Sequence, residues 1–88
     1  MEIEEKKIIE IGKVTHYFSR INVAAIKLKA PLIVGDRILI KGRTTNLEQI
    51  VDSMQIQHKN IEKAEAGEEV GLKVKDRVRA NDVVYKIL

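Results

Sequence analysis

The stretch Val34-Gly35-Asp36-Arg37-Ile38-Leu39-Ile40-Lys41-Gly42 carries the pattern that decides the fold. Glycine adopts left-handed backbone conformations easily and aspartate can bond to the amides that follow it, so Gly35-Asp36 is typical of a tight turn. The residues that follow are rich in branched apolar side chains and end at a second glycine, which is typical of a short strand. The polar run over residues 42–46 then predicts a hairpin loop into the next strand.

A weak copy of this unit occurs nearer the end of the chain. Ile26-Lys27-Leu28-Lys29 precedes Gly35-Asp36, and Leu72-Lys73-Val74-Lys75 precedes Asn81-Asp82 at the same spacing. Asparagine shares glycine's tolerance of a left-handed backbone. Two units of strand, crossing segment, turn and strand are what a closed barrel with pseudo-twofold character would contain.

The remaining apolar residues fall in short runs rather than at helical spacing, which predicts further strands. The predicted strands cover residues 8–18, 23–29, 37–41, 47–58, 70–75 and 83–88. Gly12 is expected at a bulge or at a close approach of two backbones, and a single helical turn at residues 61–64 is compatible with the composition there. The fold class that we predict is all-β, a small closed Greek-key β-barrel of about six strands.

We expect a single β-barrel domain over residues 8–88, preceded by a charged and flexible N-terminal segment at residues 1–7. Alternation predicts an inner face made of Ala24, Ile26, Leu28, Met54 and Ile56. Among the three aromatic residues, we expect Phe18 in the core, Tyr85 at a barrel end and Tyr17 exposed.

Composition narrows the classes of protein that fit. The 88 residues contain no cysteine, which excludes disulfides, thiolate metal sites and cysteine nucleophiles. No apolar run approaches the ~20 residues that span a bilayer, and the charged start does not resemble a signal peptide. We therefore predict a cytoplasmic protein with no membrane association. The mixed charge, with a net +3, is also found in thermophile proteins.

The sequence lacks the usual catalytic patterns. The nearest match to a phosphate-binding loop, Gly67-Glu68-Glu69-Val70-Gly71, has no lysine and serine after it, so we predict no nucleotide binding. His16 and His58 are not clustered with other ligands, so we predict no metal. No serine lies in a nucleophile elbow. We predict that the protein is not an enzyme and has no cofactor.

Five segments carry a resemblance to a known family. They are Gly12-Lys13-Val14 and residues 34–42, 51–56, 64–72 and 79–84. In this order they resemble the second domain of elongation factor Tu and of its translational GTPase relatives, which implies a barrel of that type, here without a GTPase domain. A similar barrel is also found at the end of some collagenase-like peptidases, so the fold alone does not fix one function.

The resemblance implies contact with transfer or ribosomal RNA. In elongation factor Tu, the aminoacyl end of tRNA binds a pocket on this barrel, at a strand that reads Glu-Met-x-Arg-Lys. Here the matching positions are Gln55, Ile56, Gln57, His58 and Lys59. Only the lysine is retained with its charge, because the glutamate and the arginine are replaced by glutamine and histidine.

Basic and hydroxyl residues on the hairpin loop support the same reading. Lys41 and Arg43 can neutralise phosphates, and Thr44 can bond to phosphate oxygens. Lys27, Lys29, Lys73 and Lys75 would extend this into a basic stripe, although such charges are usually an ordinary solvated surface. The predicted function is a non-catalytic, translation-factor-like binding module that contacts rRNA or tRNA through Lys41, Arg43, Thr44, Gln55, Gln57, His58 and Lys59.

Three apolar residues favour an alternative. Leu39 lies between Ile38 and Ile40, and Val23 and Ala25 alternate with inner-face residues, so all three are expected to face outward. An outward apolar patch suits a partner protein or a second copy. The alternative function is therefore a protein-interaction or adaptor module for a separately encoded GTPase or peptidase-like partner. A locally covered strand would explain the same residues.

Overall fold

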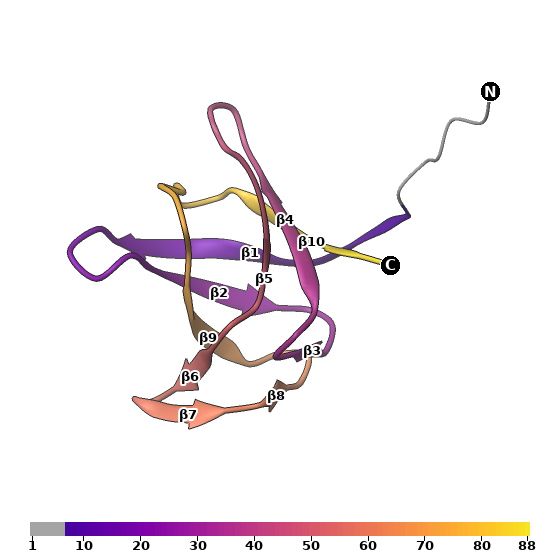
Figure 1. The fold of residues 1–88 in the computed structure, drawn as a ribbon, viewed down its shortest axis with the longest axis vertical. Helices are drawn as coiled ribbons and strands as arrows, with labels where there is room; N and C mark the ends of the chain where they lie inside the picture. Colours follow the sequence, from indigo (N-terminus) through magenta and orange to yellow (C-terminus); the bar gives the residue numbers. More distant parts are fainter. Residues whose placement is uncertain (1–6) are drawn as a thin grey trace.

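A computed structural model describes residues 7–88, which fold into strands and turns (Figure 1). The strands are β1 (Ile8–Phe18), β2 (Val23–Leu28), β3 (Leu32–Ile33), β4 (Arg37–Lys41), β5 (Asn46–Ile50), β6 (Met54–Ile56), β7 (Lys59–Ile61), β8 (Lys63–Ala64), β9 (Glu69–Lys73) and β10 (Val83–Ile87). The all-β prediction is confirmed. Within the described residues there is no helix that could span a membrane. The flexible segment predicted at residues 1–7 lies, apart from Lys7, outside this range.

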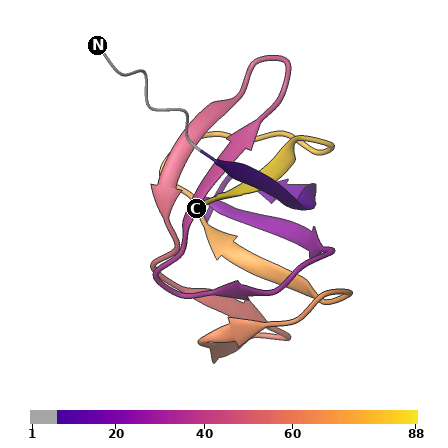
Figure 2. The ribbon, with the colours of Figure 1, turned by 90° about the vertical axis from the view of Figure 1, so that its right-hand side faces the viewer.

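The strands form an eight-stranded antiparallel sheet and a separate two-stranded one. The large sheet has the order β5-β4-β10-β1-β2-β9-β6-β7, and β3 pairs with β8. The large sheet curls around the interior, with the β3–β8 ribbon beside its lower end (Figures 1 and 2). Its edge strands, β5 and β7, do not pair with each other. The predicted closed barrel of about six strands is therefore wrong, because the sheet stays open.

The open seam follows from a break in the strand that was predicted over residues 47–58. The chain leaves β5 at Ile50 and starts β6 at Met54. Between them, Val51 donates its N–H to the Asp36 carbonyl at 2.9 Å and accepts from the Gly35 N–H at 2.9 Å. These bonds tie Val51 to the Gly35-Asp36 turn, and residues 51–53 belong to no strand. The helical turn considered at residues 61–64 is also absent, since that segment ends β7 and forms β8.

The core is filled by alternate residues of the strands. Ala24, Ile26, Leu28 and Met54 are buried and Ile56 packs against the same cluster, which confirms the predicted inner face. Gly12 sits at a register shift in the pairing of β1 with β10. A Cβ on Gly12 would lie 2.5 Å from the Lys27 carbonyl oxygen, so both expectations for this glycine are confirmed.

The two sequence units make matching hydrogen bonds. Asn81 donates its N–H to the Val14 carbonyl at 2.7 Å and the Val14 N–H donates to the Asp82 carbonyl at 2.8 Å, as Gly35, Val51 and Asp36 do in the first unit. Both turns have a left-handed residue, at a φ of 101° for Gly35 and 77° for Asn81. The weak echo in the sequence therefore corresponds to a repeated structural unit.

Candidate binding groove

The outer face of the sheet is hollowed where β1, β2, β9 and β6 lie side by side. The hollow has a volume of about 370 Å³ and is called the groove below. It is lined by Phe18, Ile21, Val23, Ala25, Gln55, Gln57, His58, Glu69, Val70 and Gly71. Half of this lining is apolar, and Phe18 and Ile21 are 46% and 58% exposed. The groove therefore offers apolar side chains that are partly exposed to solvent.

A bulge in β1 turns Phe18 into the groove. Val14 pairs with Ile26 and His16 pairs with Ala25, so Thr15 has no residue opposite it. An extra residue reverses the side on which all later side chains of a strand lie. As a result Tyr17 packs against the core and Phe18 faces out. The predictions of a buried Phe18 and an exposed Tyr17 are both wrong, because strict alternation from Val14 does not allow for the bulge.

Hydrogen bonds hold the bulge and the rings beside it. The Thr15 hydroxyl is 3.1 Å from the Ala25 carbonyl and 2.7 Å from the Glu69 carboxylate, which ties β1 to β2 and β9. The His16 ring meets the Phe18 ring edge-on, with centroids 4.4 Å apart. The Phe18 ring is therefore supported from the side while one part of it stays open to solvent.

The floor of the groove is made by small residues. Ala25 pairs with Gly71, and Gly71 pairs in turn with Gln55. A Cβ on Gly71 would be 3.5 Å from the Val23 Cγ1 and 3.8 Å from the Gln55 carbonyl oxygen, which are ordinary contacts. The glycine is therefore not required by packing, and its missing side chain deepens the groove.

The polar rim comes from the β6–β7 hairpin. Ile56 pairs with Lys59, so the loop consists of Gln57 and His58 alone, and both have positive φ, at 50° and 64°. Positive φ at both loop positions is the type I′ hairpin turn. The Gln55 amide donates to the Asn60 side-chain oxygen at 3.0 Å. The rim thus presents amide and imidazole groups on a short, well-defined turn.

The residues predicted to contact RNA fall into two separate groups. Lys41, Arg43 and Thr44 belong to the β4–β5 hairpin, whereas Gln55, Gln57, His58 and Lys59 belong to the β6–β7 hairpin. In the sheet, β10, β1, β2 and β9 lie between β4 and β6. These seven residues therefore do not form one continuous surface.

Two lysines of the predicted basic stripe form polar contacts within the molecule. The Lys27 ammonium donates to the Gly67 carbonyl at 2.7 Å, and the Lys29 ammonium is 2.7 Å from a Glu10 carboxylate oxygen. Charges engaged in this way are less available for phosphates. Within residues 7–88, no three His, Asp or Glu side chains are grouped so as to hold a metal ion.

The residues predicted to bind protein are also divided. Val23 and Ala25 line the groove, together with Gln55, Gln57 and His58 from the other predicted set. Leu39 is half-buried on β4, opposite Tyr85 and Glu48, and does not line the groove. Ile21 was not predicted as a binding residue from the sequence. Phe18 was predicted in the core, because no local sequence motif indicates the bulge at Thr15.

Comparison with known proteins gives relatives of one kind. No protein-family model matches this sequence. The chain is 49% identical over 78 residues to an uncharacterized protease of Methanocaldococcus jannaschii and 36% identical over 80 residues to a collagenase of Porphyromonas gingivalis. These matches cover 88% and 89% of the chain but only 19% of either relative.

A solved structure has the same fold. It is the C-terminal domain of a Geobacillus thermoleovorans protein classed with the U32 peptidases, with a TM-score of 0.82 over 88% of this chain and 90% of that one. Sequence identity there is 19%, so this likeness speaks for the fold alone.

These relatives overturn three predictions. The resemblance to elongation factor Tu is wrong as a statement of kinship, because the relatives are named as a protease and as collagenases. The predicted RNA-binding role at the ribosome rested on that resemblance and is wrong as well. None of these relatives supports an rRNA or tRNA partner. The prediction that the protein is not an enzyme is contradicted by the same names.

Proposed function

We propose that this chain is a polypeptide-binding domain of a U32-type peptidase and that the groove holds an extended stretch of the bound polypeptide. The observation that carries the proposal is the 49% identity with a segment of a protease. This develops the alternative of a protein-interaction module with a peptidase-like partner. Of the residues predicted to bind protein, Val23 and Ala25 line the groove and are proposed to contact the polypeptide, whereas Leu39 does not line it.

The groove has the chemistry that an extended polypeptide requires. Phe18, Ile21 and Val23 offer apolar contact, and the side-chain amides of Gln55 and Gln57 can donate to and accept from peptide groups. Cavities of roughly 300–1,000 Å³ with apolar walls and a few polar groups are typical binding sites. The type I′ turn keeps the polar rim short, so an extended chain can pass over the small floor residues.

Binding to an unfolded polypeptide tests this proposal. The immobilised 88-residue protein is exposed to heat-denatured collagen, the class of substrate suggested by the collagenase relatives. Phe18→Ser should weaken binding about tenfold, because burial of an aromatic side chain contributes a free energy of that size. Ile50→Ser is the matched control, since Ile50 is 45% exposed against 46% for Phe18 and lies on β5, outside the groove. Equal effects of the two substitutions would contradict the groove.

A second variant fills the groove instead of removing a contact. Gly71→Val places a side chain above the floor, where its Cβ would meet only ordinary contacts. Valine also favours a strand. We expect unchanged thermal stability and loss of collagen binding. A variant that binds as well as the parent would show that the polypeptide lies elsewhere.

The connection to a peptidase is tested in a chimaera. This chain replaces the matching 80 residues of the Porphyromonas gingivalis collagenase, with and without Phe18→Ser. We expect the substitution to raise KM for denatured collagen and to leave kcat unchanged, because it removes binding that ground state and transition state share. If Phe18→Ser abolishes binding by the isolated domain but leaves the KM of the chimaera unchanged, the groove binds polypeptide without contributing to the peptidase reaction.

A further inference from the structure

A second hollow lies on a different part of the molecule and is polar. It has a volume of about 360 Å³ and is called the arginine pocket below. Its lining is Thr44, Thr45, Asn46 and Leu47 from the β4–β5 hairpin, and Asp76, Arg77 and Arg79 from the segment that joins β9 to β10. No residue lines both this pocket and the groove.

Both walls of the arginine pocket are held in place. The buried Gln49 side chain donates to the Lys73 carbonyl at 2.9 Å and accepts from the Lys75 N–H at 2.8 Å, which fastens β5 to the start of the joining segment. Val78, between the two arginines, is 1% exposed and anchors the segment in the core. The Asp82 carboxylate accepts from the Arg79 N–H at 2.8 Å. The pocket is therefore part of the fold rather than a gap between loose loops.

The pocket contains hydrogen-bond donors that the protein does not use. Arg77 and Arg79 make no ion pair with any carboxylate of residues 7–88. Thr45 is only 6% exposed, and its hydroxyl makes no hydrogen bond to a described residue. The hydroxyl oxygen is nevertheless not fully shielded from solvent. Thr45 is one of the residues that line the pocket.

We propose that the arginine pocket binds a carboxylate of a polypeptide, either its C-terminal carboxylate or an acidic side chain. Guanidinium groups bond carboxylates through two parallel N–H donors, and hydroxyl and amide groups can complete the shell. Arg77 and Arg79 contribute two positive charges to the lining of the pocket and Asp76 contributes one negative charge, which leaves one net positive charge. This net charge matches a monoanion better than a doubly charged phosphate. This inference goes beyond the proposed function and does not depend on the groove.

Chemical-shift titration of the ¹⁵N-labelled 88-residue protein tests the inference. The probes are acetyl-trialanine with a free carboxylate, its C-terminal amide, acetyl-Ala-Glu-Ala amide, and inorganic phosphate. We expect saturable shifts at residues 44–47 and 76–79 with one or both carboxylate peptides and none with the neutral amide. The peptide that binds identifies the source of the carboxylate. Equal binding of the neutral amide, or binding of phosphate alone, would overturn the proposal.

Substitutions assign the binding to the pocket. Arg77→Gln and Arg79→Gln should each weaken carboxylate binding about fivefold or more, because a charge-assisted hydrogen bond is replaced by a neutral one. Thr45→Val keeps the buried shape and removes the hydroxyl, so a smaller loss with unchanged stability is expected. Arg20→Gln, an exposed arginine of the β1–β2 turn, is the matched control. If both pocket arginine variants bind like this control, the proposal is wrong.

Discussion

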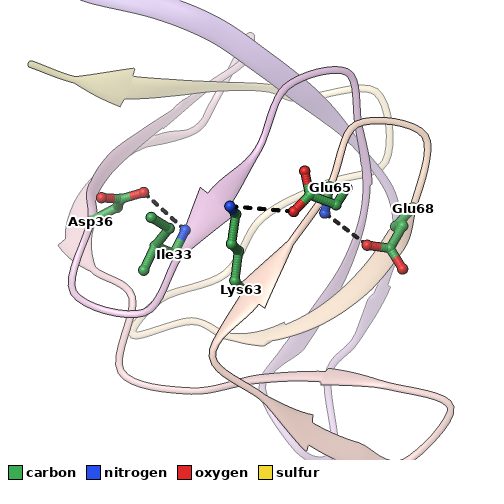
Figure 3. Close-up of polar contacts among 5 residues, drawn as sticks. All are labelled: Ile33, Asp36, Lys63, Glu65 and Glu68. Atoms are coloured by element: carbon green, nitrogen blue, oxygen red, sulfur yellow. Dashed lines mark hydrogen bonds and ion pairs between the residues drawn. The ribbon is translucent and has the colours of Figure 1, made fainter.

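The turns at Gly35–Asp36 and Asn81–Asp82 make the same hydrogen bonds but stand against different neighbours. The Asp36 carboxylate accepts from the Ile33 N–H at 2.9 Å, and the Asp82 carboxylate accepts from the Arg79 N–H at 2.8 Å (Figure 3 shows the first). Each aspartate also donates its own N–H to the carbonyl of the same partner, three residues earlier. The sequence suggested that such aspartates bond to the amides that follow; the bonded amides precede them.

The neighbours of the two aspartates decide what each turn does. Asp36 is half-buried and pairs with the Lys86 ammonium at 3.2 Å. Asp82 is only 5% exposed and lies directly against Gly42, at the base of the β4–β5 hairpin. The first turn therefore shapes the exposed end of β3, while the second supports Arg79 and the hairpin that together wall the arginine pocket. One local motif thus serves two different purposes in the same molecule.

Gly42→Ala should have the largest effect on this comparison. A Cβ at Gly42 would overlap the Asp82 carboxylate, and no such neighbour exists for Asp36. We expect the free energy of unfolding to fall by about 3 kcal/mol, the upper part of the range for overpacking a rigid site. Urea denaturation measures this. Gly35→Ala, which has open space around it but a φ of 101°, is the control and should lose less. An equal or larger loss there would show that backbone strain, not the neighbour, separates the turns.

Asp82→Ala should have the second-largest effect on the free energy of unfolding. It removes a charge-assisted bond from a nearly buried site and leaves the Arg79 N–H without its acceptor, so we expect a loss of about 2 kcal/mol in urea denaturation. Because Arg79 is then less well held, carboxylate-peptide shifts at residues 76–79 should weaken too. Retained shifts would mean that the turn is not needed to position Arg79.

Asp36→Ala should cost less, about 1 kcal/mol, although it removes both a turn bond and an ion pair. The ion pair is partly exposed, with 26% of the Lys86 side chain and 19% of the Asp36 side chain accessible. The measurement is again urea denaturation, now at low and high salt. A loss as large as that of Asp82→Ala would show that burial does not distinguish the two turns.

Asn81→Gly should have the smallest effect, within about 0.5 kcal/mol, because glycine adopts the positive φ of this position freely but loses more entropy on folding. Thermal denaturation is sensitive enough to detect a change of this size. This variant gives the second turn the Gly-Asp sequence of the first, so any remaining difference between the turns arises from their neighbours.

Much of the fold could be predicted from local patterns. Alternation placed Ile26 and Leu28 in the core, and the repeated spacing of the Gly-Asp and Asn-Asp pairs identified the structural units. The open sheet could not be predicted, because the break between β5 and β6 goes with hydrogen bonds from Val51 to the Gly35-Asp36 turn, which is distant in the sequence.

The candidate sites were predicted less well than the fold. Val23, Ala25, Gln55, Gln57 and His58 were named from the sequence, but as members of two unrelated sites, and sheet order alone brings them together. Arg77 and Arg79 received no role, because nothing local shows that their segment packs beside the β4–β5 hairpin. Such contacts are set by topology rather than by motif.

The bulge at Thr15 has a consequence for how a binding surface of this kind can arise. One additional residue in β1 puts an aromatic ring on the outer face and its neighbour in the core, while the pairing of β1 with its neighbours continues on both sides. Insertion or deletion of a single codon at this point would therefore decide whether the aromatic ring lies in the groove or in the core, with little change to the rest of the domain. Related domains could share this scaffold and still differ in whether they hold a polypeptide.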